Sequence, residues 1–129
     1  MKIENLINKL FETREKANSF HYNIESRSIH IIMEEYYTEI LELTDKLVEV
    51  YIGKYDTIGD YISIVDEESI KNNDILNYFE NVTKYIKHCS EETFNKEEDT
   101  HLLSIVDDIY NLLYRTIYKI KVLTKNETY

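Results

Sequence analysis

Residues 20–55 read FHYNIESRSIHIIMEEYYTEILELTDKLVEVYIGKY, and five side chains in this stretch are able to bind a metal ion. They have the spacing His-x8-His-x3-Glu-x10-Asp-x3-Glu and are His21, His30, Glu34, Asp45 and Glu49. Imidazole and carboxylate groups are the ligands that suit iron, manganese and zinc in proteins. Apolar residues recur here every three to four positions, which predicts helix rather than strand.

The last four of these residues form two pairs, and each pair has the i, i+4 spacing that places side chains on one helical face. His30 and Asp45 are fifteen residues apart, which on a single helix is roughly 22 Å. One ion cannot bridge that distance. If both pairs serve one site, a second copy of the helix has to run antiparallel to the first, and the site lies between subunits.

The helix expected at residues 29–52 has two inward faces at 100° per residue. One is an apolar stripe of Ile29, Met33, Tyr36, Ile40, Leu43, Leu47 and Val50. The other is a mixed stripe of His30, Glu34, Tyr37, Leu41, Asp45 and Val48. Because a single chain would leave the apolar members of the second stripe exposed, we expect the protein to form at least a dimer.

Three further helices are expected, at residues 2–23, from 73 or 74 to about 89, and 99–124. Ser28 is the expected N-cap of the helix at 29–52, and Gly53 is its expected stop. The polar residues of the first helix lie largely off its apolar stripe, on the solvent side; they are Glu4, Lys9, Glu12, Arg14, Glu15 and Lys16. Residues 90–98 are expected to form an acidic turn.

The chain has no proline and only two glycines, which favours a few long helices. Residues 53–73 are the longest irregular stretch, with a short helix expected around 61–70. We therefore predict an all-α, antiparallel four-helix bundle with a long crossover between its second and third helices, which is the ferritin-like arrangement. The domain should span residues 1–125, with a frayed tail at 126–129.

A formal charge of −10 repels nucleic-acid phosphates and attracts cations. We therefore expect nucleic-acid binding to be absent, or weak and bridged by divalent cations. No run of residues is apolar enough to predict a membrane span. The single cysteine, Cys89, excludes an intrachain disulfide and suits a reducing compartment, so the expected location is the cytoplasm.

The stretch 20–55 resembles the Dps-like mini-ferritins, and especially the short forms encoded by phages and large viruses. That family has a histidine at the end of its first helix, a histidine followed by an acid at i+4 in the second, and then Asp-x3-Glu. The stretch DTHLLSIVDDIYNLLYRTIYKI at residues 99–120 also resembles the last helix of the viral forms. Two positions depart from the pattern: Tyr22 stands where tryptophan is usual, and Glu34 where aspartate is usual.

The resemblance implies a ferroxidase that oxidises Fe²⁺ with peroxide or O₂ and protects the cell, or the host cell of a virus, against both. It implies ligation of iron, or of manganese or zinc, by His21, His30 and Glu34 of one subunit with Asp45 and Glu49 of another. A shell of twelve subunits is also implied. The alternatives are a non-catalytic viral assembly module and a nucleoid-binding protein, although the lysine-rich N-terminal extension of DNA-binding members is absent. His88 and His101 lie outside the pattern and are expected to be ordinary surface residues.

Overall fold

The computed structural model describes residues 3–59 and 67–123, and within these ranges the protein is helical with no strand. This confirms the prediction of an all-α protein. None of the described helices has both the length and the apolar character that crossing a membrane requires. The helices are α1 (Ile3–Asn23), α2 (Arg27–Tyr55), α3 (Glu67–Lys71), α4 (Ile75–Thr93) and α5 (Thr100–Leu123).

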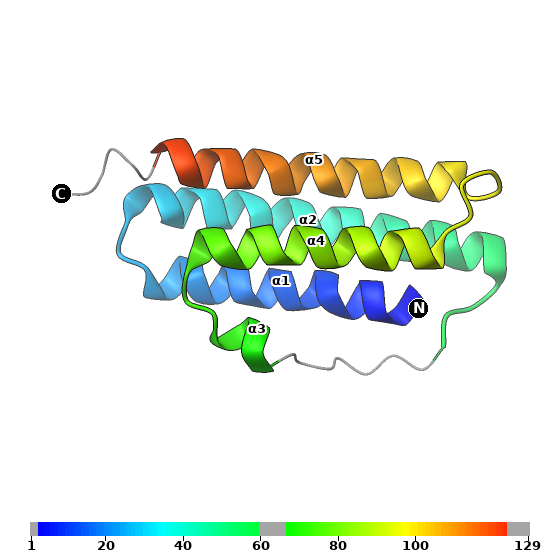
Figure 1. Ribbon diagram of the computed structural model, residues 1–129, viewed down its shortest axis with the longest axis horizontal. Coiled ribbons are helices and arrows are strands. Elements are labelled where there is room, and N and C mark those ends of the chain that lie inside the picture. The colour runs from blue at the N-terminus through cyan, green and yellow to red at the C-terminus, as the bar shows by residue number, and fades with distance from the viewer. Residues whose placement is uncertain (1–2, 60–66, 124–129) are drawn as a thin grey trace.

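The four long helices lie side by side, and the short α3 lies outside them near α1 (Figure 1). Helices α1 and α5 each pack against both α2 and α4. The chain reverses direction at the short connections from α1 to α2 and from α4 to α5, whereas α2 and α4 run in the same direction (Figure 1). The chain therefore crosses the length of the molecule between α2 and α4. Part of the short helix expected around 61–70 corresponds to α3, and residues 60–66 lie outside the described residues.

The apolar stripe expected on α2 faces the core, with five of its members buried: Ile29, Met33, Tyr36, Ile40 and Leu47. Tyr36 is the largest of them, and its hydroxyl donates a hydrogen bond of 2.7 Å to Thr13 Oγ1 on α1. Burial raises the pKa of the Tyr36 hydroxyl, so it remains a donor. A polar atom in the core is tolerated here because it has a partner.

The ends of α2 differ from the prediction. The N-cap is Ser26, not Ser28, and Ser26 Oγ accepts a hydrogen bond of 3.3 Å from the Ile29 N–H. The helix also continues through Gly53 to Tyr55, and its C-cap, Asp56, has a left-handed φ of 71° and donates its N–H to the Ile52 carbonyl. Gly53 has open space around it. A glycine therefore did not end the helix, because tertiary contacts of the next two residues hold another turn in place.

Those contacts form a group at the C-terminal end of α2 that we call the Asp99 latch: Lys54, Tyr55, Asn95 and Asp99. Lys54 Nζ donates to Asp99 Oδ1 at 2.8 Å, and the Tyr55 hydroxyl donates to the same oxygen. The Asn95 N–H donates to Asp99 Oδ2 at 2.8 Å. The latch joins α2 to the turn between α4 and α5. That turn begins at Phe94, four residues later than predicted, because α4 continues to Thr93.

The side of α1 that faces away from the apolar stripe also differs from the prediction. Lys9, Glu12 and Lys16 were expected to face solvent, yet all three are buried. Lys16 Nζ donates to the Ile70 carbonyl, and Ser69 Oγ donates to Glu12 Oε2 at 2.9 Å. Helix α3 thus covers this side of α1. Helical periodicity alone could not predict this, because the covering residues are more than fifty positions further along the chain.

Candidate metal centre

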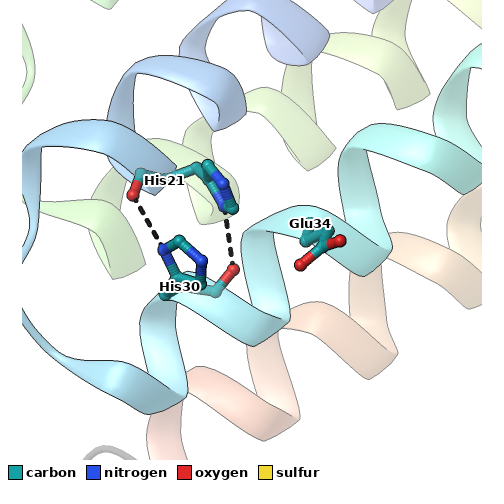
Figure 2. A group of neighbouring side chains, drawn as sticks. All are labelled: His21, His30 and Glu34. Carbon is teal, nitrogen blue, oxygen red and sulfur yellow. Dashed lines mark hydrogen bonds between the residues drawn. The ribbon is translucent and has the colours of Figure 1, made fainter.

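Three of the five residues singled out in the sequence come together where α1 ends and α2 begins. His21 lies in the last turn of α1, His30 in the first turn of α2, and Glu34 one turn further along α2 (Figure 2). Each offers one ligand atom, and these atoms all lie within 4.8 Å of one another. We call this group the histidine cluster. Among the described residues, no other set of three or more histidine, cysteine or acidic side chains is as close.

The two histidines bind each other's backbone. His21 Nδ1 lies 3.1 Å from the carbonyl oxygen of His30, and His30 Nδ1 lies 3.2 Å from the carbonyl oxygen of His21. The rings are stacked, with centroids 3.8 Å apart and planes inclined by 25°. Figure 2 shows this reciprocal arrangement, with Glu34 beside it. The pair therefore fixes both the turn between the helices and the orientation of the two rings.

The hydrogen bonds also fix the tautomer of both histidines. A carbonyl oxygen only accepts, so each Nδ1 must carry the proton and donate it. In a neutral imidazole the other nitrogen, Nε2, then holds an unshared electron pair. Histidines that bind metals usually have this arrangement, in which the far ring nitrogen donates to a backbone carbonyl and the near one ligates. In their neutral form, both histidines of the cluster thus offer Nε2 to a metal ion.

The local sequence explains why the two rings meet. Residues 24–26 alone separate α1 from α2, so the last turn of one helix lies beside the first turn of the other. The carbonyl of His21 is among the last four of α1, which lack intrahelical partners, and the His30 ring supplies one. Tyr22 occupies the position next to the cluster; its ring contacts that of His21 edge-on, and its side chain is 75% exposed.

The dimensions of the cluster fit a transition-metal ion. Bonds of about 2.0–2.2 Å to nitrogen and oxygen place neighbouring ligands in a coordination shell about 3–3.5 Å apart. The ligand atoms here lie within 4.8 Å of one another, so a rotation of the Glu34 side chain toward the two rings brings its carboxylate closer to that spacing. Glu34 is exposed, so this rotation meets little resistance. Three protein ligands leave positions open for water, an oxidant or ligands from another chain.

Asp45 and Glu49 do not join the cluster. Both are exposed on α2, and neither side chain makes a hydrogen bond or ion pair with another described residue. Asp45 is fifteen residues beyond His30 on the same continuous helix, and the rise of the helix therefore separates them by roughly 22 Å. Within one chain the structure brings together His21, His30 and Glu34 only, and the part of Asp45 and Glu49 in a shared site stays a prediction.

The second stripe of α2 is less exposed than expected. Tyr37, Leu41 and Val48 are half-buried rather than open to solvent. The Arg14 guanidinium on α1 lies 4.6 Å from the centroid of the Tyr37 ring and donates a hydrogen bond of 2.8 Å to the Tyr37 hydroxyl. Val48 packs against the core. The chain itself thus covers part of this stripe, which weakens the argument from exposure for a dimer.

The histidines outside the pattern behave as expected. His88 and His101 are both exposed, on α4 and α5. His88 Nε2 lies 3.0 Å from Glu92 Oε1, one turn along the same helix. A surface pair of this kind contributes little to stability, and neither residue approaches the histidine cluster's ligand set.

Fold and site together describe an all-α protein with an unsaturated histidine–carboxylate cluster at a helix junction. The chain belongs to a family of unknown function, DUF5856, whose model matches residues 21–120. The matched range includes all five residues of the sequence pattern. No curated protein and no solved structure matches the chain.

Proposed function

We propose that this protein is a ferritin-like metal-binding protein whose substrate is Fe²⁺. The site would consist of His21, His30 and Glu34 of one subunit, completed by Asp45 and Glu49 of a second. The observation that carries the proposal is the pair of reciprocal Nδ1–carbonyl hydrogen bonds. They leave both Nε2 atoms as electron-pair donors, and the Glu34 carboxylate of the same cluster has no other described partner.

The order and direction of the helices support a ferritin-like bundle. Four long helices pack in a ring of neighbours, and the connection between α2 and α4 joins two helices that run in the same direction. A four-helix bundle with one long crossover has this arrangement, and an up-down-up-down bundle does not. We therefore propose a ferritin-like topology, with α3 as part of its crossover.

The ligand types suit iron oxidation. The imidazoles are neutral ligands that bind Fe²⁺, while carboxylates stabilise the higher charge of Fe³⁺. Two Fe²⁺ ions each give up one electron to a peroxide, which with two protons becomes two waters. Asp45 and Glu49 of a partner would supply negative charge where Fe³⁺ forms. Mn²⁺ and Zn²⁺ fit the same ligands, and Zn²⁺ would bind without oxidation.

A second function also has an observation in its favour. The reciprocal bonds of the two histidines join α1 to α2 directly, so the same contacts would serve a bundle that binds no metal. In that case the protein is a non-catalytic ferritin-like binding or assembly module. The two functions differ in one measurable property, which is the affinity of the cluster for a divalent cation.

The test is calorimetric titration of Fe²⁺ under anaerobic conditions into protein purified without chelators. We expect saturable binding that His30→Ala and Asp45→Ala each weaken by more than about tenfold, since each removes a ligand. An equal mixture of the two variants, allowed to exchange subunits, should recover about one quarter of the sites, because only hybrid dimers contain a complete set and only at one of their two sites.

Three results would contradict parts of the proposal. Unchanged binding in Asp45→Ala, with loss in His30→Ala, would place the whole site within one chain. A monomer at micromolar concentration by sedimentation would remove the intersubunit geometry. Absence of any saturable Fe²⁺, Mn²⁺ or Zn²⁺ binding would favour the assembly module.

A further inference from the structure

An open groove of about 960 Å³ lies between α2 and α5. It lies on the flank of α2 opposite the histidine cluster, because residues 39 and 42 are turned roughly 120–180° from residue 30 at 100° per residue. The charged and aromatic residues that line the groove include Glu39, Glu42, Asp108, Tyr114, Arg115 and Tyr118.

Two ion pairs connect the helices that form the groove. Arg115 Nη2 lies 3.2 Å from Glu39 Oε2, and Lys119 Nζ lies 2.8 Å from Glu35 Oε2. Arg115 and Lys119 of α5 are therefore paired with acids of α2. Glu42 and Asp108 have no such partner: both are exposed, and neither side chain makes a hydrogen bond or ion pair with another described residue. With three carboxylates and one guanidinium, the groove has a net charge of −2.

Two tyrosines of α5 form an aromatic wall that internal packing does not explain. Tyr114 is 59% exposed and Tyr118 is 62% exposed. Their hydroxyls make no hydrogen bond with another described residue. Burying an aromatic ring is favourable, so two neighbouring rings left open beside a groove mark a surface that a partner covers.

We propose that this groove binds a basic segment of a partner protein. The face of a tyrosine ring attracts an ammonium or guanidinium group, and the Glu42 and Asp108 carboxylates are acceptors for the same cations. A chain with a formal charge of −10 also attracts a basic segment from a distance. An acidic segment or a nucleic acid would be repelled by the same charges.

The geometry also indicates the conformation of the bound segment. Tyr114 and Tyr118 are one helical turn apart on α5, which is roughly 6 Å along the axis. In an extended chain, residues i and i+2 are about 6.6 Å apart and project on the same side. Arginine or lysine at alternate positions of an extended segment therefore matches the two rings, whereas basic residues at adjacent positions project on opposite sides of the segment and do not.

The experiment is fluorescence anisotropy with a labelled peptide of alternating glycine and arginine, GRGRGRG, titrated with the full chain. Its controls are a peptide of the same composition in which no two arginines are two positions apart, GRRGGRG, and the glutamate peptide GEGEGEG. We expect the alternating peptide to bind most tightly and the glutamate peptide not to bind. Loss of both rings in Tyr114→Ala with Tyr118→Ala should weaken binding about fivefold or more.

Matched variants separate the groove from general charge. Glu42→Gln with Asp108→Asn should weaken binding, whereas Glu91→Gln with Glu97→Gln removes the same charge elsewhere and should change it little. Tyr114→Phe with Tyr118→Phe keeps both rings and should bind nearly as well as the native chain. Equal binding of both arginine peptides, or equal loss in the two acid-to-amide pairs, would overturn the proposal. A change in sedimentation of the tyrosine-to-alanine variant without peptide would do so too, since the occupant would then be a second copy.

Discussion

Two polar clusters include residues of α1, and they differ in how completely their atoms are bonded. The buried carboxylate cluster consists of Lys9, Glu12, Ser69 and Tyr78. Glu12 accepts hydrogen bonds at both oxygens, from Lys9 Nζ at 3.2 Å and from Ser69 and Tyr78 hydroxyls at 2.9 Å. The histidine cluster is instead at the surface, and its Nε2 atoms and the Glu34 carboxylate accept no hydrogen bond from another described residue.

The comparison distinguishes a structural cluster from a binding site by whether the polar atoms already have hydrogen-bond partners. Every oxygen of Glu12 is already used, so a metal ion could bind there only by displacing Lys9 and two hydroxyls. Burial raises the pKa of Tyr78, and the negative charge of Glu12 raises it further, so the hydroxyl stays a donor. In the histidine cluster the hydrogen bonds use only the Nδ1 side of each ring. The ligating side is left for a metal.

The largest effect on stability should come from breaking the saturated cluster. Glu12→Ala leaves the Lys9 ammonium, 8% exposed, without its carboxylate. Removing one member of a buried ion pair costs about 3–5 kcal/mol of unfolding free energy. Urea denaturation followed by circular dichroism measures this. On the same helix, Glu15 is exposed, and Glu15→Ala should change stability by no more than about 0.5 kcal/mol. An equal loss of stability in both variants would contradict a structural role for the Glu12 carboxylate.

The opposite pattern is expected for the unsaturated cluster. His21→Ala combined with His30→Ala should reduce divalent-metal affinity by more than about 100-fold, or 2.7 kcal/mol. Its unfolding free energy without metal should change by only about 1 kcal/mol, since exposed hydrogen bonds contribute little. Titration with Mn²⁺ and urea denaturation in EDTA separate the two quantities. A variant that binds Mn²⁺ normally but unfolds readily would show that the two histidines have a structural role only.

The Asp99 latch is a second saturated cluster, and its stability should depend on pH. Burial acts to raise the pKa of Asp99, but the hydrogen bonds from Lys54, Tyr55 and the Asn95 N–H outweigh it and lower the pKa overall. A carboxylate with a lowered folded-state pKa stabilises the fold above its unfolded pKa, near 3.9, and this contribution is lost as pH falls through the folded value. Asp99→Asn should lower stability by about 2 kcal/mol at pH 7.

Lys54 and Tyr55 set the upper limit of the pH range in which the latch stabilises the fold. The hydrogen bond to Asp99 is the main cause of the raised pKa values of Lys54 and Tyr55. Their stabilising effect is complete below about pH 10 and is lost as pH rises through the folded values. Urea midpoints measured from pH 3 to pH 11 should thus show a plateau for the native chain. For Asp99→Asn the decline of the urea midpoint below pH 4 should be smaller than for the native chain. A parallel decline in both proteins would show that other carboxylates cause the loss of stability in acid.

Helix α2 shows most clearly how much of the site the sequence predicts. The i, i+4 spacing placed His30 and Glu34 on one face without any knowledge of the fold, because helical geometry relates near neighbours. His21 belongs to another helix, and only the three-residue connection between α1 and α2 brings its ring against that of His30. The tautomer of both rings also follows from these contacts, so it had no signal in the sequence.

By itself, the sequence determined the helical class, the buried stripe of α2 and, to within a residue or two, the start of α4, whose N-cap Asp74 accepts from the Asn77 N–H. These depend on residues within one or two turns, where periodicity and capping act. Only the tertiary structure decided that Glu12 is buried, that α2 extends past Gly53, and that Tyr114 lines a groove. Each of these depends on which distant segment covers a surface, and local spacing does not encode that.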